Sequence, residues 1–135
     1  MRARFPRLDV AAAVAESATL ARSRLIVLAV KPQQMRDVAA ALLPMLASAR
    51  PLLLSIAAGI RGADLSRWLG GYGAIVRTMP NTPALIGQGI AGLYARGTID
   101  PAGRLAVESA LAPTGRVLWF DREGDLDAVT AVSGS

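Results

Sequence analysis

The chain of 135 residues contains no cysteine and no histidine. Without cysteine there is no disulfide framework, no thiolate nucleophile and no cysteine metal ligand. Without histidine the commonest general base and the commonest metal ligand are missing. Ser-His-Asp and Cys-His hydrolases are therefore excluded for this chain alone, and no metal site is expected.

Long apolar runs and aromatic residues are also scarce. The longest strongly apolar run, residues 25–30, is far shorter than the roughly 20 residues that a membrane span needs. Asp9 and Glu16 interrupt the faintly signal-like N-terminus, so we expect a cytoplasmic protein without a membrane partner. The net charge is +5, but the arginines are scattered and only two each of Trp, Tyr and Phe could stack on bases, so no nucleic-acid partner is expected.

What the chain does have is a series of short, continuous apolar runs, which are typical of strands covered on both faces. They predict strands at residues 8–11, 25–30, 52–56, 74–77, 90–94 and 116–120. Helices are predicted between them at residues 12–20, 33–46, 64–69, 101–111 and 123–132. This alternation predicts an α/β fold with a parallel sheet.

A stiff polar loop follows the predicted strand 74–77. Pro80 and Pro83 bracket Asn81 and Thr82, and the prolines fix φ on both sides of the polar pair. The loop comes just past the carboxyl end of a strand, where α/β proteins place ligand contacts. Asn81 and Thr82 are therefore candidates for holding a flat ring or a carboxylate. A turn that bonds its own backbone is the plainer alternative.

Two earlier strand ends carry small residues and a charge. The segment Ala29-Val30-Lys31-Pro32 ends one strand and opens a helix, so Lys31, the only lysine, can offer its charge to a phosphate or ribose. The segment Ile56-Ala57-Ala58 with Gly59 ends the next strand and removes side-chain bulk where a ligand would lie. The plainer alternatives are a solvated lysine and close helix–sheet packing.

Residues 87–92 match the dinucleotide fingerprint G-x-G-x-x-G but lack its structural context. The fingerprint needs a strand before it and a helix after it, so that the pyrophosphate meets a helix N-terminus. Here a proline-containing loop precedes it, and residues 93–97 are too short for a helix. We therefore expect a glycine-rich strand that another backbone approaches closely.

The end of the chain, Ser133-Gly134-Ser135, is a small polar loop after a predicted helix. Its backbone N–H groups could form an anion nest, although a helix cap with a frayed end is the plainer reading. Arg77 puts a charge near the same region and is otherwise an ordinary surface arginine. Trp68 and Trp119 are expected in the core or at an interface.

Read in order, residues 27–33, 55–60, the loop 79–83 and residues 128–135 resemble pyrroline-5-carboxylate reductase, a family that reduces a cyclic imine to proline with NAD(P)H. The resemblance covers about residues 25–135 and implies a partial Rossmann-type sheet with flanking helices in three α/β/α layers. It implies that NADP or NAD is bound by Ala29, Val30, Lys31, Pro32, Ile56, Ala57, Ala58, Asn81 and Thr82. It also implies that Ser133, Gly134 and Ser135 hold the carboxylate of the imine substrate.

Two family features are not visible: a Gly-rich phosphate loop on a first strand and a helical domain after Ser-Gly-Ser. We therefore expect an internal piece of such an enzyme, inactive alone. Residues 1–120 would be a partial dinucleotide-binding domain, and 121–135 the start of a helical dimerisation domain of a homo-oligomer. The alternatives are a non-catalytic α/β binding module and part of a hydroxyacid-dehydrogenase-type oxidoreductase. Strands 25–30, 52–56 and 74–77 should form a parallel core, with 25–30 as an edge prone to self-association.

Overall fold

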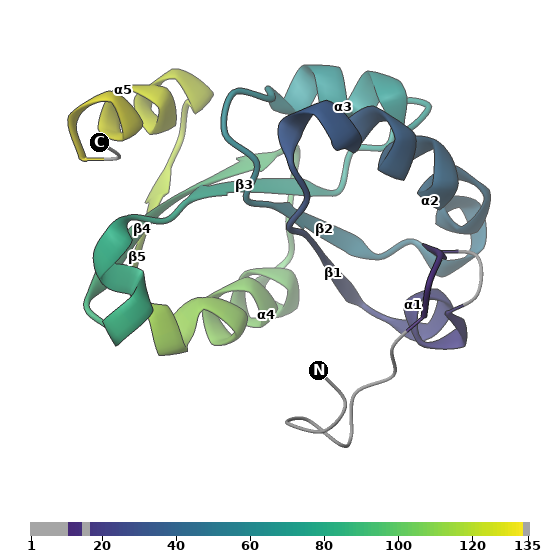
Figure 1. The fold of residues 1–135 in the computed structure, drawn as a ribbon, viewed down its shortest axis with the longest axis horizontal. Helices are drawn as coiled ribbons and strands as arrows, with labels where there is room; N and C mark the ends of the chain where they lie inside the picture. The colour runs from purple at the N-terminus through teal and green to yellow at the C-terminus, as the bar shows by residue number, and fades with distance from the viewer. Residues whose placement is uncertain (1–10, 15–16, 134–135) are drawn as a thin grey trace.

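The structure, a computed structural model, describes residues 11–14 and 17–133. Five strands form one sheet in the order β1-β2-β3-β4-β5 (Figure 1). The strands are β1 (Leu25–Leu28), β2 (Leu52–Ser55), β3 (Ile75–Met79), β4 (Gly89–Arg96) and β5 (Gly115–Phe120). The α-helices are α1 (Ala18–Arg22), α2 (Met35–Ala49), α3 (Gly62–Trp68), α4 (Pro101–Leu111) and α5 (Glu123–Ser133). The described residues also form the short 3-10 helices η2 (Pro32–Gln34), η3 (Thr82–Ile86) and η4 (Ala112–Thr114).

The sheet is mixed, which corrects the prediction of a wholly parallel sheet. Strands β1, β2 and β3 are parallel, as predicted, but β4 runs antiparallel to β3, and β5 is parallel to β4. Residues 80–88 connect β3 to β4 and are too few for the crossover that a parallel neighbour requires. The α/β class with flanking helices is confirmed.

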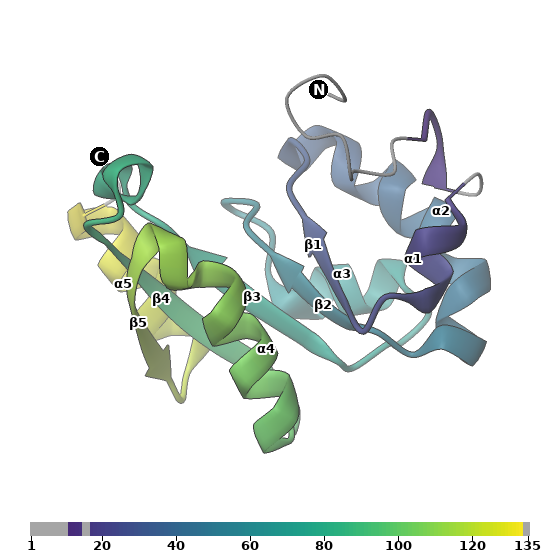
Figure 2. The same ribbon diagram turned by 90° about the horizontal axis from the view of Figure 1, so that it is seen from below.

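Helices cover both faces of the sheet. On one face, α2 and α3 pack on Leu28, Leu53 and Ile75. On the other, α4 inserts Val107 against β-strand residues that include Val76. Figure 1 shows α2, α3 and α5 on one side and α4 on the other, and Figure 2 shows α4 lying across β3 and β4. Continuous apolar strands are needed because both faces are buried.

Most element boundaries agree with the predictions to within two or three residues, and α4 agrees at both ends. Asp100 caps this helix, since its Oδ1 accepts a hydrogen bond from Gly103 N at 2.7 Å. The helix predicted at 12–20 forms only in its last part. Residues 12–14 are not α-helical, residues 15 and 16 lie outside the described residues, and α1 begins at Ala18, after the Ser17 side chain caps it. Of the predicted strand 8–11, residues 8–10 lie outside the described residues, and Ala11 is not in a strand.

Gly89 and Gly92 belong to strand β4 and not to a phosphate loop, as expected, whereas Gly87 ends η3 in the left-handed conformation (φ +73°). At Gly89, where β4 begins, an added Cβ would lie 2.8 Å from both the carbonyl oxygen of Thr114 and Cα of Ala84. An added Cβ at Gly115 would collide with the backbone of Gly89. The close approach of the two backbones therefore explains why glycine occupies both positions. Among the described residues, no helix has the length and apolar character needed to cross a membrane.

Candidate functional site

Three of the four predicted motifs follow neighbouring parallel strands and therefore meet at one edge of the sheet. Leu28 pairs with Ser55, and Ser55 pairs with Arg77, so β1, β2 and β3 end side by side. The ladder continues beyond the strands, because Ile56 N donates to Leu28 O at 3.2 Å. We call the loops at 29–32, 56–59 and 80–82 the carboxyl edge. Ligands of open α/β sheets bind at this kind of edge.

Lys31 supplies the positive charge of the carboxyl edge. Its backbone is extended (φ −63°, ψ 146°), and its carbonyl accepts a hydrogen bond from Gln34 N at 2.9 Å as η2 begins. Its side chain is exposed and makes no ion pair with a carboxylate within residues 11–14 and 17–133. The ammonium group is therefore available to an anionic ligand.

The loop after β2 leaves open space beside its backbone. Ala57 is 5% exposed, and its N–H donates to Ser55 Oγ at 3.3 Å. Gly59 has φ +78°, which only glycine adopts without strain, and an added Cβ there would meet no atom within 4 Å. The carboxyl edge thus offers a ligand an unobstructed approach to the backbone at this position.

Asn81 joins the stiff loop to the next strand. Its side-chain Oδ1 accepts a hydrogen bond from Ile90 N at 3.0 Å. Its backbone carbonyl accepts a hydrogen bond from Ala84 N at 3.0 Å, but its side chain makes no cap to η3. The amide nitrogen has no partner among the described residues, so it can donate to a ligand. The backbone of Thr82 begins η3 beside it.

A buried ion pair joins α5 to β3, and the sequence did not predict it. Arg77 is not a surface arginine: its side chain is 3% exposed, and Nη1 donates to Glu123 Oε1 at 2.8 Å and to Asp127 Oδ1 at 3.4 Å. The same Glu123 oxygen accepts from Gly62 N at 2.6 Å. The available signal was a pair of acids four residues apart on one face of a predicted helix.

The pKa of Glu123 reflects this network. Burial of its carboxylate raises the pKa, but the hydrogen bonds from Gly62 N and Arg77, together with the charges of Arg77 and Arg61, outweigh burial and hold the pKa below its usual value. Glu123 is therefore a fixed anion near neutral pH, not a proton donor.

Helix α5 packs against β3 and β4. Its first turn contacts Arg77 in the middle of β3, and the next turn places Leu126 against Gly92, whose strand partner is Met79 at the end of β3. Ser133 is the last residue of the helix. The predicted carboxylate site continues into Gly134 and Ser135, which lie outside the described residues.

Both tryptophans pack as expected. Trp68 lies against the core beside α2, with the guanidinium of Arg36 5.4 Å from its ring centre. Trp119 donates from Nε1 to Glu108 Oε1 at 2.8 Å, and Arg104 stacks 4.4 Å from its ring centre. Neither ring contributes to the carboxyl edge.

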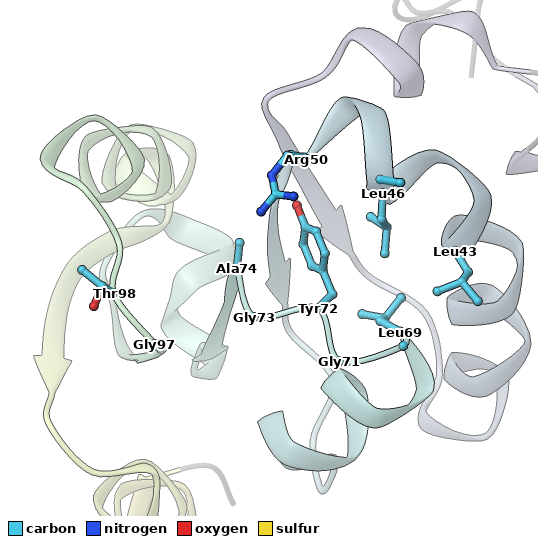
Figure 3. Close-up of a pocket in the computed structure, with 12 residues that line it drawn as sticks. Leu43, Leu46, Arg50, Leu69, Gly71, Tyr72, Gly73, Ala74, Gly97 and Thr98 are labelled. Carbon is cyan, nitrogen blue, oxygen red and sulfur yellow. The ribbon is translucent and has the colours of Figure 1, made fainter.

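A cavity of about 660 Å³ lies at the opposite, amino end of the parallel strands (Figure 3). It is formed by the end of α2, the loop before β3 and the residues after β4, so it shares no residue with the carboxyl edge. The cavity and the predicted motifs thus lie at opposite ends of the parallel strands. We assign the candidate site to the carboxyl edge, because the predicted ligand-binding segments meet there.

Comparisons with known proteins point to one enzyme family. The chain is 47% identical over 128 residues to a pyrroline-5-carboxylate reductase of Pseudomonas aeruginosa, covering 95% of this chain and 46% of that protein. It is 41% identical over 134 residues to the Haemophilus influenzae enzyme of the same name, covering 99% and 49%. The chain therefore spans about half the length of the curated relatives it matches. No family model matches it.

Solved structures agree. The pyrroline-5-carboxylate reductase of Coxiella burnetii matches with a TM-score of 0.78 and 37% identity, over 83% of this chain and 42% of that chain. The Plasmodium falciparum enzyme, solved with NADP bound, matches with a TM-score of 0.72 and 33% identity, over 84% and 44%. A prephenate dehydrogenase of Aquifex aeolicus, at 17% identity and a TM-score of 0.63, shares the fold alone.

Proposed function

We infer that this chain, which is related over most of its length to the pyrroline-5-carboxylate reductases, forms the cofactor-binding part of an enzyme that reduces 1-pyrroline-5-carboxylate to L-proline with NADPH or NADH. One observation carries the proposal: three motifs distant in sequence follow adjacent parallel strands and form one edge. The NADP bound in the related Plasmodium falciparum enzyme supports the same ligand class.

The residues of the carboxyl edge fit a nicotinamide dinucleotide. The exposed ammonium of Lys31 suits a phosphate or ribose oxygen. The small residues Ala57 and Ala58, with the open space beside Gly59, let a ligand lie against the backbone. The unpartnered amide nitrogen of Asn81 suits the carboxamide oxygen, and the 82–83 segment stiffens its loop.

The chemistry agrees with a site that has no histidine. When bound, the reduced nicotinamide supplies a hydride to the C=N carbon of the substrate. A protonated imine is already electrophilic, so the chain's main task is to position the reactants. Lys31 and Asn81 would orient the cofactor, and the end of α5, with Ser133, Gly134 and Ser135, would hold the substrate carboxylate.

Location and assembly follow from the same proposal. A biosynthetic reductase with these features acts in the cytoplasm as a homo-oligomer, with residues 121–135 leading into the oligomerisation domain. A non-catalytic module derived from the fold would keep the carboxyl edge but support no turnover. A hydroxyacid-dehydrogenase-type enzyme would share only the fold, as the prephenate dehydrogenase similarity does.

A chimera tests the proposal. The matching 128-residue segment of the Pseudomonas aeruginosa reductase is replaced by this chain, since the two are 47% identical there. We expect the chimera to oxidise NADPH in the presence of pyrroline-5-carboxylate. Its kcat should lie within about tenfold of the kcat of the intact relative; an ordinary kcat for an enzyme is ~10 s⁻¹. A folded chimera, judged by circular dichroism, that shows no turnover would refute the proposal and favour the binding module.

A further inference from the structure

The cavity at the amino end of the strands is a second candidate site that the proposed function does not use. We call it the amino-edge cavity; it lies between the end of α2, the segment 69–74 and residues 97–98. Its volume of about 660 Å³ falls within the range of small-molecule sites. We propose that the amino-edge cavity binds a small organic monocarboxylate with an apolar ring or branched chain, held at its acid group by Arg50.

The cavity has an apolar wall. Leu46 and Leu69 are 3% and 2% exposed and form its inner side, while Leu43 is 44% exposed and extends the wall outward (Figure 3). A leucine left this open next to a concavity gains from covering by an apolar group. The wall therefore suits a hydrocarbon body rather than a sugar.

Arg50 provides one positive charge at the rim. It ends α2 in the left-handed conformation (φ 46°, ψ 50°), the only residue other than glycine with positive φ in the described part of the chain. Its N–H donates to Leu46 O at 3.2 Å, which holds the backbone. The guanidinium makes no ion pair within the described ranges, so it can pair with a carboxylate.

Tyr72 completes the polar side without competing for Arg50. Figure 3 shows its hydroxyl beside the Arg50 guanidinium, and the hydroxyl donates to the carbonyl of Pro51. Burial raises the pKa of Tyr72, and the nearby charge of Arg50 only partly opposes this. The phenol is therefore neutral near pH 7, so the rim carries one uncompensated cation. One cation with an apolar wall selects a monoanion with a hydrocarbon body over a polyanionic nucleotide.

The loop before β3 leaves room for such a ligand. An added Cβ at Gly71 or Gly73 would meet no atom within 4 Å. Gly71 needs glycine for its φ of +90°, whereas Gly73 does not have positive φ and could carry a side chain. A bulky residue at position 73 is therefore a way to fill the cavity without disturbing the backbone.

The test is an amide-resolved NMR titration of the chain with 3-phenylpropionate. We expect saturable shifts for Gly71, Gly73, Gly97 and Thr98, and none for Lys31 or Ala58. The neutral analogue 3-phenylpropanamide should bind about tenfold more weakly, because it cannot form the charge-assisted pair.

Variants separate the charge from the shape of the site. Arg50→Asn keeps a residue that tolerates left-handed backbone and should weaken 3-phenylpropionate about tenfold. Gly73→Leu should abolish binding, while Arg116→Gln removes an exposed charge on β5, outside the cavity, and should change nothing. The proposal is overturned if folded wild-type chain shows no saturable shifts, if the shifts cluster at the carboxyl edge, or if Arg50→Asn binds as wild type.

Discussion

At the scale of single residues, Arg77 is the one charged residue that is buried in the described part of the chain. Its guanidinium is 3% exposed, and the carboxylates of Glu123 and Asp127 compensate the cost of burying this charge. The neighbours of Arg77 in β3, which are Ile75, Val76 and Thr78, are all buried. An apolar residue would therefore be expected at position 77. Its partners lie on an element nearly fifty residues later, so local sequence could not reveal the pair.

Substituting Arg77 should be far more costly than substituting an exposed arginine. Arg77→Met leaves the Glu123 carboxylate without its partner and should lower the free energy of unfolding by about 3–5 kcal/mol. The matched control is Arg67→Met, whose pair with Asp64 at 3.2 Å is solvent-exposed and should change the value by less than about 1 kcal/mol. Urea unfolding followed by circular dichroism measures both. Equal effects would mean that the Arg77 pair contributes no more than a surface contact.

Glu123 should make stability depend on acid pH. Its folded-state pKa lies below its unfolded value, about 4.3, so the ionised carboxylate stabilises the fold above that pH. This contribution is lost as the pH falls through the folded-state pKa. Glu123→Gln should flatten the decline of the thermal midpoint between about pH 5 and pH 3. An unchanged pH profile in Glu123→Gln would contradict the assignment.

The residue types at the carboxyl edge were easier to predict from the sequence than the burial of Arg77. Lys31, Ala57 and Asn81 follow strands in a pattern that the sequence displays directly, and the structure brings their segments together. The partner of Asn81 was not predictable, because Ile90 reaches it only once β4 turns back along β3.

At the scale of elements, apolar runs predicted the existence of the strands but not their directions. Residues 80–88 could have been read as too short for a parallel crossover, but the alternation of strands and helices elsewhere favoured a parallel sheet. The helix expected at 12–20 was drawn from alanine content, whereas α1 begins only where Ser17 caps it. Helix propensity without packing does not decide a boundary.

The packing of α5 on β4 depends on a glycine without a side chain. A Cβ at Gly92 would lie 2.7 Å from Leu126 Cδ1 and 3.0 Å from Phe120 Cε2. Gly92→Val should therefore destabilise the chain by about 1–3 kcal/mol through overpacking. Gly124 lies in α5, and a Cβ added there would meet no atom within 4 Å. Gly124→Ala should therefore stabilise the chain by up to about 1 kcal/mol. Thermal unfolding distinguishes the two, and a neutral Gly92→Val would show that α5 is not seated as described.

At the scale of the whole molecule, the two edges of the parallel strands carry different sets of side chains. The carboxyl edge carries Lys31, small residues and Asn81, and the amino edge carries a leucine-walled cavity with Arg50. The family resemblance predicted the first, because its motifs are continuous in sequence. The second joins residues from α2, the loop before β3 and the end of β4, and no continuous motif marks it.

The most direct test of the central claim, that the carboxyl edge binds a nicotinamide dinucleotide, is an amide-resolved NMR titration of the chain with NADP⁺. We predict saturable shifts for Ala29, Lys31, Ala57, Gly59 and Asn81. Lys31→Ala should weaken binding about tenfold to a hundredfold, the value of a charge-assisted hydrogen bond. Arg24→Ala, which removes an exposed charge before the opposite end of β1, should leave affinity unchanged. Shifts confined to residues away from the carboxyl edge, or equal losses in both variants, would contradict the claim.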